Sequence, residues 1–525
     1  MKRPALLLLA LAAALSLSGC GEDAAPADEI RYASTKDIRD INPHLYLGEM
    51  AAQNMVFEPL VVNAESGVKP WLAKSWDISA DGRVYTFRLR DGVKFSDGEP
   101  FTAEAVKQNL DAVAANLPRH QWLDLANAIE KTEAPDPLTF RLTLRHPYYP
   151  ALTELALTRP FRFISPRCFK DGGTAKGVSC LAGTGPWVLS EHKRNQYALF
   201  EQNPLYWGEK PKARSVRWRV MPDPQAMLLA LEKGEIDLIY GSDGDQLNLD
   251  AFEKLAREGK FATEISAPVA SRAILMNTRG PVTGEAAVRE ALEHAVDKDA
   301  IAKGVLNGTE AKAETLLSPS VPYCDAGLKP KAFDPELAAA LLDKAGWVPG
   351  PDGTRAKAGR RLEFTLWFNA KNAQEKTIAE YLQSDLKKIG ADLRIAGEEK
   401  QAFLDRQRTG AFDLMYSLSW GTPYDPQSYL SSWRIPAHGD YQAQLGLPRK
   451  AWLDAEITRL MAETNSSKRA AMVRGILAYI HDSDVYIPLS YSRTKAVHAK
   501  RLVGVGFLPS QYEIPFEKMS LAAPR

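Results

Sequence analysis

The stretch at residues 420–443 carries the residue types best suited to binding a small ligand. Aromatic side chains are interleaved there with glycine, proline and aspartate, and the aromatic residues are Trp420, Tyr424, Tyr429, Trp433 and Tyr441. No helical or strand period runs through the stretch, and its prolines bias the residues before them away from the helical basin. We therefore expect a long structured loop, and loops of this length inside a domain are usually functional. Near its end, His438 is flanked by small residues and is a candidate metal ligand, although the stretch alone favours a surface loop with a solvated histidine.

The other histidines form no metal-binding or catalytic motif. The chain has eight histidines, and none pair at H-x-H or H-x-x-x-H spacing. We expect His294 and His481 on or at the end of helices, in capping or surface roles. H-E-x-x-H, G-x-S-x-G and glycine-rich phosphate-binding motifs are missing as well. Because triad residues can be scattered along a chain, these absences disfavour an enzyme, and an exported metal-dependent hydrolase stays as an alternative.

The elements that must position these side chains alternate between helix and strand. Residues 84–90 and 138–144 have the apolar–polar alternation of half-buried strands, and Thr102 can cap a helix between them. In the second half, apolar residues at helical spacing predict helices at 284–306, 335–345, 377–389 and 468–480. Strand-like segments follow the last two helices, at 393–395 and 485–489. Helix followed by strand, repeated along the chain, predicts α/β lobes.

The length, composition and charge of the chain limit the number of domains and the kinds of partner that we expect. The chain has 525 residues, of which 45% are hydrophobic and 25% charged, and this length is enough for two to four domains. The formal net charge is +1. With no large excess of one sign, we expect neither nucleic acid nor anionic lipid as a partner.

The N-terminus has the form of an export signal. Lys2 and Arg3 precede an apolar segment at 6–17 that is too short to span a bilayer. Residues 1–19 are therefore expected to be a signal peptide. Leu17-Ser18-Gly19-Cys20 resembles the lipobox of bacterial lipoproteins, which implies lipid attachment at Cys20 and a polar tether at 20–29. More than one acyl chain is needed for durable anchoring, and a plain signal peptide cut nearby is the alternative.

Three cysteines remain in the mature chain. Cys168 and Cys180 are close in sequence, with glycines between them, and in an oxidising compartment they could close a loop worth roughly 3 kcal/mol. Cys324 would then be unpaired. A three-cysteine metal site is disfavoured because there is no C-x-x-C motif and no nearby histidine.

Several motifs that lie far apart in the sequence together match the pattern of one known class of proteins. They are Pro70-Trp71-Leu72-Ala73, Tyr85-Thr86-Phe87, Val93-Lys94-Phe95, Asp97-Gly98, Phe101-Thr102-Ala103, Gly183-Thr184-Gly185-Pro186-Trp187, Tyr206-Trp207 and Gly234-Glu235-Ile236-Asp237. In these motifs the chain resembles the dipeptide/oligopeptide/nickel class of extracellular solute-binding proteins. The resemblance implies an α/β fold with two lobes, mixed sheets and a hinge between the lobes. Lobe 1 would take 30–265 plus 490–525, with an inserted subdomain at 71–175, and lobe 2 would take 266–489.

A closer resemblance points to one subgroup of that class. In five segments, and in the loop before the last of them, the chain looks like the nickel-binding proteins of nickel ABC importers. The segments are 119–127, 148–150, 154–164, 320–323 and 441–444. That resemblance implies that His438 binds the metal, that Arg119 and Arg159 hold a chelator, and that Met50 lines the pocket. It also implies aromatic walls made by Trp122, Trp420 and Tyr424.

The residue types agree with these implied roles. One imidazole cannot satisfy nickel, which takes several ligands, and arginine offers planar bidentate donors to the carboxylates of a chelator. Tyr512 stands where the subgroup tends to carry a smaller residue, so a different or smaller chelator is expected if this position lines the pocket.

The sequence therefore predicts a binding protein, not an enzyme. We expect a monomeric, exported, periplasmic lipoprotein, held at the membrane by its lipid, that binds nickel as a small-molecule chelate and delivers it to an ABC permease and its ATPase. Within the class, a binder of short peptides or of another metal–metallophore complex is the alternative.

Overall fold

The computed structural model describes residues 28–241 and 246–522. The predicted signal peptide and Cys20 lie outside these residues. None of the helices in the described ranges has the length and apolar character that crossing a membrane requires.

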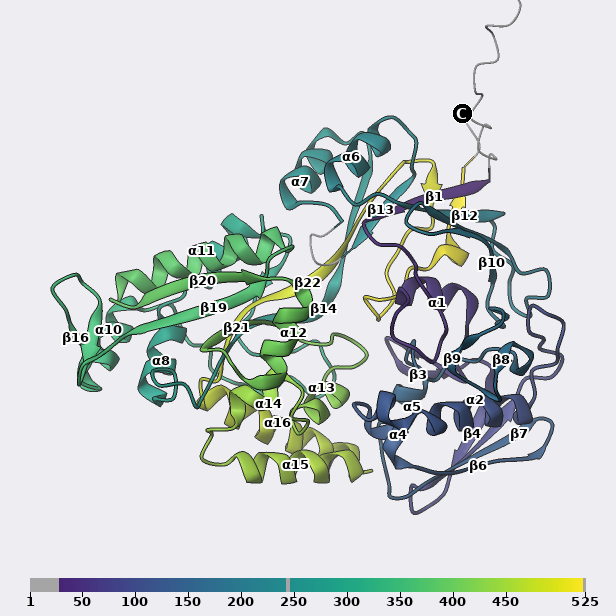
Figure 1. The fold of residues 1–525 in the computed structure, drawn as a ribbon, viewed down its shortest axis with the longest axis horizontal. Coiled ribbons are helices and arrows are strands. Elements are labelled where there is room, and N and C mark those ends of the chain that lie inside the picture. Colours follow the sequence, from purple (N-terminus) through teal and green to yellow (C-terminus); the bar gives the residue numbers. More distant parts are fainter. Residues whose placement is uncertain (1–27, 242–245, 523–525) are drawn as a thin grey trace, which may run out of the picture.

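An eleven-stranded mixed sheet runs through the molecule (Figure 1). In spatial order its strands are β10 (Trp187–Lys193), β11 (Tyr197–Gln202), β12 (Ser215–Val220), β1 (Glu29–Ser34), β13 (Leu238–Gly241), β22 (Tyr486–His498), β14 (Ala262–Met276), β21 (Leu414–Leu418), β19 (Glu363–Asn369) and β20 (Asp392–Glu398). The short β15 (Ala311–Lys312) also pairs with β22. The pairs of β1 with β12 and β13, and of β19 with β20 and β21, are parallel, whereas the other pairs are antiparallel. The sheet confirms the predicted mixed α/β class.

Two long strands carry the chain from one half of this sheet to the other. β22 pairs with β13 through its C-terminal residues, and β14 pairs with β21 through its C-terminal residues. The two strands lie side by side along most of their length, on the diagonal that joins the two parts of Figure 1. The predicted lobe boundaries, at 265/266 and 489/490, fall inside these strands. We keep the names lobe 1 and lobe 2 for the predicted ranges, and the boundaries stay predictions.

Lobe 1 carries a second sheet below the main one (Figure 1). Its order is β4 (Ala73–Ile78), β5 (Val84–Leu89), β7 (Thr139–Leu144) and β6 (Ile129–Asp136), and α2 (Ala103–Ala115) packs on β6 and β7. The side chain of Thr102 accepts a hydrogen bond from the backbone nitrogen of Ala105, as the predicted cap requires. The other lobe 1 elements are α1 (Met50–Val56), β2 (Val61–Ala64), β3 (Gly67–Pro70), α3 (Leu117–His120), α4 (Asp124–Ala128), α5 (Ala151–Leu155), η1 (Pro166–Cys168), α6 (Pro224–Glu232), α7 (Leu249–Glu258), β23 (Leu502–Val503), η3 (Phe516–Lys518) and β24 (Ser520–Leu521).

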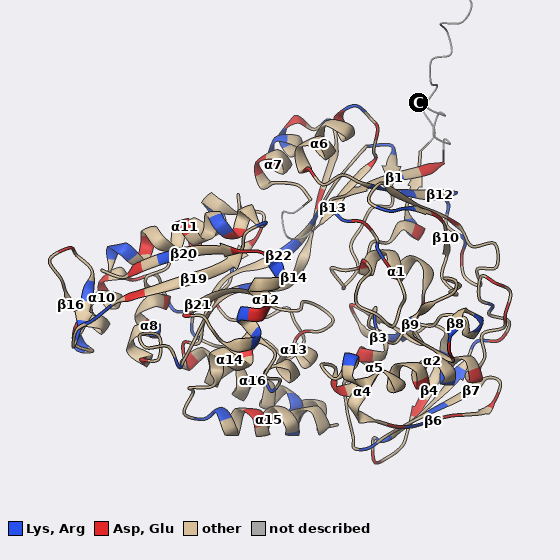
Figure 2. Cartoon of the chain, viewed as in Figure 1, with Lys and Arg blue, Asp and Glu red and all other residues tan. Residues whose placement is uncertain are grey.

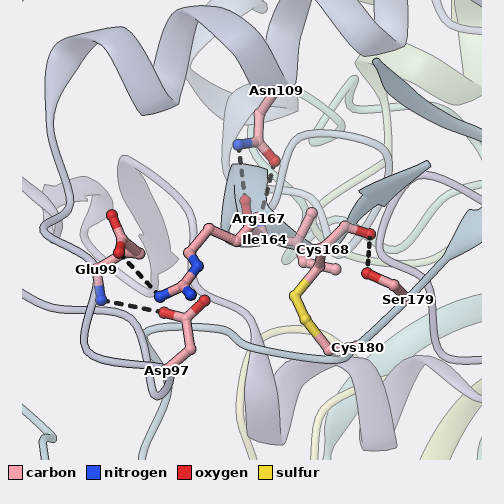
Figure 3. The surroundings of a disulfide bond; sticks show 8 residues. All are labelled: Asp97, Glu99, Asn109, Ile164, Arg167, Cys168, Ser179 and Cys180. Carbon is pink, nitrogen blue, oxygen red and sulfur yellow. Dashed lines mark hydrogen bonds and ion pairs between the residues drawn. A yellow bond between two sulfur atoms is a disulfide. The ribbon is translucent and has the colours of Figure 1, made fainter. Parts of the chain in front are cut away.

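Cys168 and Cys180 are joined by a disulfide in the structure (Figure 3). The bond ties η1 to the end of the hairpin formed by β8 (Phe169–Lys170) and β9 (Gly173–Val178). Ser179 strengthens the same connection, since its hydroxyl donates to the carbonyl of Cys168 at 3.1 Å. Cys324 is buried and unpaired.

In lobe 2, helices cover both faces of the main sheet. Its helices are α8 (Ala286–His294), α9 (Lys298–Ala300), the π-helical turn η2 (Ile301–Val305), α10 (Pro335–Lys344), α11 (Ala373–Lys388), α12 (Lys400–Thr409), α15 (Lys450–Ala462) and α16 (Ser466–Asp482), with a small sheet of β16 (Val348–Pro349), β17 (Arg355–Lys357) and β18 (Arg360–Arg361). The single helix predicted at 284–306 is wrong. Asp297 interrupts it, because its side chain accepts from the backbone nitrogen of Ala300 and starts a new turn. Basic and acidic residues are interspersed over both lobes (Figure 2).

The stretch at 420–443 is not the uninterrupted loop that the sequence predicted. It contains α13 (Gln427–Ser432) and α14 (Gly439–Gln444), and His438 is the N-cap residue of α14. Each helix has six residues, fewer than two turns, so no repeating apolar face could reveal it in the sequence.

Candidate functional site

Two tryptophans mark the place where the lobes meet. Trp122 lies between α3 and α4 in lobe 1, and Trp420 follows β21 in lobe 2. Their rings pack edge to face with centroids 5.5 Å apart. Both residues were expected to wall a ligand site, and around this contact the structure gathers most of the other predicted site residues.

On the lobe 1 side, the ring of Tyr46 is the centre of the arrangement. The indole nitrogen of Trp122 donates to its hydroxyl at 2.9 Å. The guanidinium groups of Arg159 and Arg119 lie 5.2 and 5.9 Å from its ring centroid, within the range of cation–π attraction. Tyr46 therefore contacts both predicted chelator-binding arginines and one of the predicted aromatic wall residues, Trp122.

The two arginines bring positive charge to the cluster. Arg159 is half-buried and donates to the carbonyl of Gly48 at 3.0 Å, and Arg119 is exposed. Neither forms an ion pair with a carboxylate in the part of the chain that the structure describes. Burial lowers the pKa of Arg159 from its ordinary value because desolvation disfavours the cation, although the nearby Glu49 carboxylate opposes the effect. Such a pair of cations favours an anionic ligand.

On the lobe 2 side, His438 faces the ring of Trp420. Their ring centroids are 5.4 Å apart, and the imidazole is half-buried rather than exposed as the sequence suggested. Burial lowers the pKa of His438, although Asp440 opposes the effect, so the ring is neutral at neutral pH. Its two nitrogens form no hydrogen bond with any residue in the described ranges. A neutral imidazole with an unused lone pair is the form that binds metals.

Tyr424 and Tyr512 complete the wall behind Trp420. The ring of Tyr424 is 6.2 Å from Trp420 and 5.9 Å from Tyr512. The hydroxyl of Tyr512 donates to the carbonyl of Trp420 at 3.3 Å. The C-terminal tail, which is predicted to belong to lobe 1, thus contacts the lobe 2 part of the site, and the side chain of Tyr512 occupies one side of it.

Met50 is not tied to this cluster. It is the first residue of α1 and half-buried, two positions after the Gly48 carbonyl that accepts from Arg159. Its sulfur forms no hydrogen bond with the described residues. Contacts in the structure therefore link Arg119, Arg159, Trp122, Trp420, Tyr424 and His438, and the pocket role of Met50 stays a prediction.

Sequence reasoning missed two residues of the cluster. Tyr46 lies in a segment without any motif, and His120, whose Nδ1 atom is 2.8 Å from the Tyr46 hydroxyl, received no role. His120 lies between Arg119 and Trp122, within the segment 119–127 that carries the resemblance to nickel-binding proteins, and this position was its signal in the sequence. Only the folded chain shows that Tyr46 links them.

The lobes also touch directly below the cluster, where α4 and α5 face α13. Asp124 accepts a hydrogen bond from the hydroxyl of Ser431 at 2.5 Å and forms an ion pair with Arg434. Glu154 accepts from the hydroxyl of Ser428 at 2.8 Å. These contacts join residues far apart in the chain, and opening of the lobes would break them.

Comparison with protein families identifies the fold. The model of the bacterial extracellular solute-binding proteins, family 5, matches residues 67–441. The chain belongs to this family. The match confirms the class predicted from the sequence motifs.

Two relatives of this solute-binding protein are similar over nearly its whole length. It is 45% identical over 504 residues to the nickel-binding periplasmic protein of Escherichia coli K12, which covers 95% of the chain and 96% of that relative. The crystal structure of NikA from Brucella suis in complex with Fe(III)-EDTA has 46% identity and a TM-score of 0.92, and covers 94% of this chain and 99% of that one. The two-lobed architecture is the same. A glutathione-binding protein of Salmonella paratyphi A is more distant, with 27% identity over 450 residues and 84% of both chains covered.

Proposed function

We propose that this solute-binding protein captures nickel as a complex with a small chelator and passes it to a membrane permease driven by an ATPase. One observation carries the proposal. A neutral, half-buried imidazole lies next to Trp420, in the same cluster as two arginines; among the described residues, neither imidazole nitrogen has a hydrogen-bond partner and neither arginine forms an ion pair with a carboxylate. The similarity to nickel-binding periplasmic proteins over almost the full chain supports it.

The chemistry of the cluster assigns the roles. His438 supplies one nitrogen to the metal, and nickel needs several more ligands, so a chelator provides the rest. Arg119 and Arg159 bind its carboxylates, since guanidinium forms paired, charge-assisted bonds with them. Trp122, Trp420 and Tyr424 enclose the complex, and Met50 stands at its margin. The protein acts by binding, with nickel as cargo.

Residues from both lobes contribute, and this explains how capture would close the protein. A ligand that contacts both lobes binds the closed form more tightly and shifts the population towards it, and hinge closure is the usual motion of periplasmic binding proteins. The hinge is formed by β14 and β22, between a lobe 1 of 30–265 with 490–525 and a lobe 2 of 266–489. Lipid attachment at Cys20 would hold the monomer at the membrane, on the periplasmic side.

The bulk of Tyr512 narrows the choice of chelator. Its ring lies against Tyr424, and its hydroxyl is bonded to the Trp420 carbonyl. Two arginines match a ligand with two or more carboxylates, and a side chain as large as tyrosine leaves less room than a smaller residue would. We therefore expect a compact complex, such as nickel bound by two histidine molecules, which together carry two carboxylates, ahead of large polycarboxylates.

Tryptophan fluorescence tests the proposal, because Trp122 and Trp420 lie in the cluster. Nickel alone, nickel with histidine, and short peptides including glutathione would be titrated into wild type, His438→Ala and His146→Ala, the last being an exposed control histidine. We expect a change only with nickel and chelator, weakened in His438→Ala and unchanged in the control. A response to peptides but to neither nickel condition would instead make the protein a peptide carrier, as its likeness to a glutathione-binding protein allows.

A further inference from the structure

His120 belongs to the cluster, but none of the proposed ligand contacts uses it. It is the last residue of α3, and its side chain has 0% exposure. Its Nδ1 atom is 2.8 Å from the hydroxyl oxygen of Tyr46. Its Nε2 atom is buried and has no hydrogen-bond partner among the described residues. A buried unpaired nitrogen is costly, so its retention calls for an explanation.

Counting donors around Tyr46 fixes the tautomer of His120. The indole N–H of Trp122 can only donate, so the Tyr46 oxygen accepts from it. If Nδ1 also donated to this oxygen, the hydroxyl hydrogen of Tyr46 would have no acceptor among the described residues, and the buried Nε2 would be a second unsatisfied atom. The arrangement with fewer unsatisfied groups has the hydroxyl donating to the Nδ1 atom of His120. Nδ1 therefore carries no hydrogen, and the ring of the neutral histidine holds its hydrogen on Nε2. The unpaired Nε2–H is the consequence of keeping Nδ1 as an acceptor.

The charge state of His120 agrees with this assignment. Burial, reinforced by the nearby Arg119 cation, lowers the pKa of His120 to about 4. Protonation would place a hydrogen on Nδ1, facing an oxygen whose own hydrogen points the same way. The hydroxyl would then have to turn, and the bond from Trp122 would compete with it.

Several site residues depend on the orientation of Tyr46. Trp122 is bonded to the hydroxyl and packs edge to face on the ring at 5.8 Å, and both arginines lie over the ring. We infer that His120 is a positioning residue: as a fixed hydrogen-bond acceptor it holds Tyr46, and through Tyr46 it sets Arg119, Arg159 and Trp122 for an anionic chelate. In its effect on affinity this inference rests on the proposed function, whereas the tautomer does not.

Replacement by leucine and by asparagine separates positioning from packing. The amide oxygen of His120→Asn stands where Nδ1 was and can still accept, whereas His120→Leu fills space without an acceptor. Tyr46→Phe keeps the ring and removes the hydroxyl. We expect His120→Leu and Tyr46→Phe each to weaken binding of nickel–histidine about five-fold, the value of one lost hydrogen bond. We expect His120→Asn to bind within about two-fold of wild type.

The double variant decides whether the two residues act through each other. If His120 works through the hydroxyl, then His120→Leu with Tyr46→Phe binds no more weakly than either single variant. Two independent losses that multiply would overturn the inference, and so would wild-type affinity in a folded His120→Leu protein. Equal losses in His120→Asn and His120→Leu would also overturn it, because packing alone would then explain both.

The tautomer can be measured without any ligand. In protein labelled with ¹⁵N-histidine, the chemical shifts distinguish a bare ring nitrogen from a protonated one, and the signals missing in His120→Asn identify His120. We expect Nδ1 bare and Nε2 protonated in the ligand-free protein at neutral pH, and a hydrogen on Nδ1 would overturn the inference. If wild type binds no nickel chelate, the proposed function fails while this result stands, so the two failures are distinguishable.

Discussion

Arg159 and Arg162 lie three positions apart, and replacing each in turn distinguishes an effect on ligand binding from an effect on stability. Arg159 has one hydrogen bond, to the Gly48 carbonyl, and no carboxylate partner in the described ranges. Arg162 is buried, donates to the carbonyl of Phe57 at 3.0 Å and forms an ion pair with Glu513 at 3.0 Å. We therefore expect the same replacement, arginine to glutamine, to weaken ligand binding at position 159 and folding at position 162.

The magnitudes follow from what each side chain loses. At position 159, glutamine is too short to reach the Gly48 carbonyl as the guanidinium Nη1 does, so one hydrogen bond is lost. A partly desolvated charge is removed at the same time, so the free energy of unfolding should change by less than about 1 kcal/mol. A chelator carboxylate would lose a charged two-bond fork, on the order of 2 kcal/mol, which is about a 30-fold loss of affinity. At position 162, Glu513 would be left without its cation. Breaking a buried pair costs about 3–5 kcal/mol, and since the Glu513 side chain keeps 24% exposure, we expect about 2–3 kcal/mol.

The assay pairs urea unfolding of the ligand-free protein with calorimetric titration of nickel–histidine. Arg159→Gln should unfold at the wild-type urea midpoint and bind weakly, and Arg162→Gln should unfold at a clearly lower midpoint. Arg159→Gln with wild-type affinity would refute the reasoning, since the unpaired cation would then have no ligand. A loss of 2 kcal/mol or more of its stability would equally refute it, by showing that Arg159 is structural.

Three further perturbations test other contacts. Asp124→Asn removes the charge that pairs with Arg434 across the lobes, so the ligand-free protein should open and its radius of gyration in small-angle scattering should rise; an unchanged curve would be contrary. Burial raises the pKa of Glu154 from 4.5 to about 7, so the folded protein holds this proton more tightly than the unfolded chain. Its contribution to stability is then present below pH 4.5 and lost as the pH rises to about 7, a fall of about 3 kcal/mol in the free energy of unfolding. Urea unfolding at several pH values should show a smaller fall for Glu154→Gln than for wild type. The same dependence of unfolding free energy on pH in both proteins would contradict the assignment. Tyr512→Ala makes room beside Tyr424, so calorimetry should show nickel bound with a bulky polycarboxylate more tightly than by wild type, and unchanged affinity would show that Tyr512 does not limit the ligand.

Local features of the fold were predictable from the sequence because short-range interactions determine them. Asp334 directly precedes the helix predicted at 335–345, and its side chain accepts from the backbone nitrogen of Leu337 at the start of α10. The cap at Thr102 has the same origin. The break at Asp297 was missed because the apolar spacing continues through it, and the full length of β22 was missed because pairing with β13 and β14 extends it.

The arrangement of the candidate site depends on contacts between distant parts of the chain, which short-range sequence patterns do not reveal. The resemblance to nickel-binding proteins implied a metal for His438 and a chelator for Arg119 and Arg159, and the residue types agreed with those roles, but no local pattern joined the three residues. Tyr46 and His120 join the arginines to Trp122 through ring contacts and hydrogen bonds between separate parts of the chain. Such contacts exist only once the chain is folded, so the sequence could name the members of the cluster without its centre.

Equilibrium dialysis of the mature protein tests the central claim most directly. Wild type and His438→Ala would be dialysed against nickel freed of chelators and against nickel with labelled histidine, and retained metal and histidine would both be counted. The account predicts that wild type retains nickel only together with histidine, and that His438→Ala retains less of both. Nickel retained without any chelator, or retained equally by His438→Ala, would contradict it.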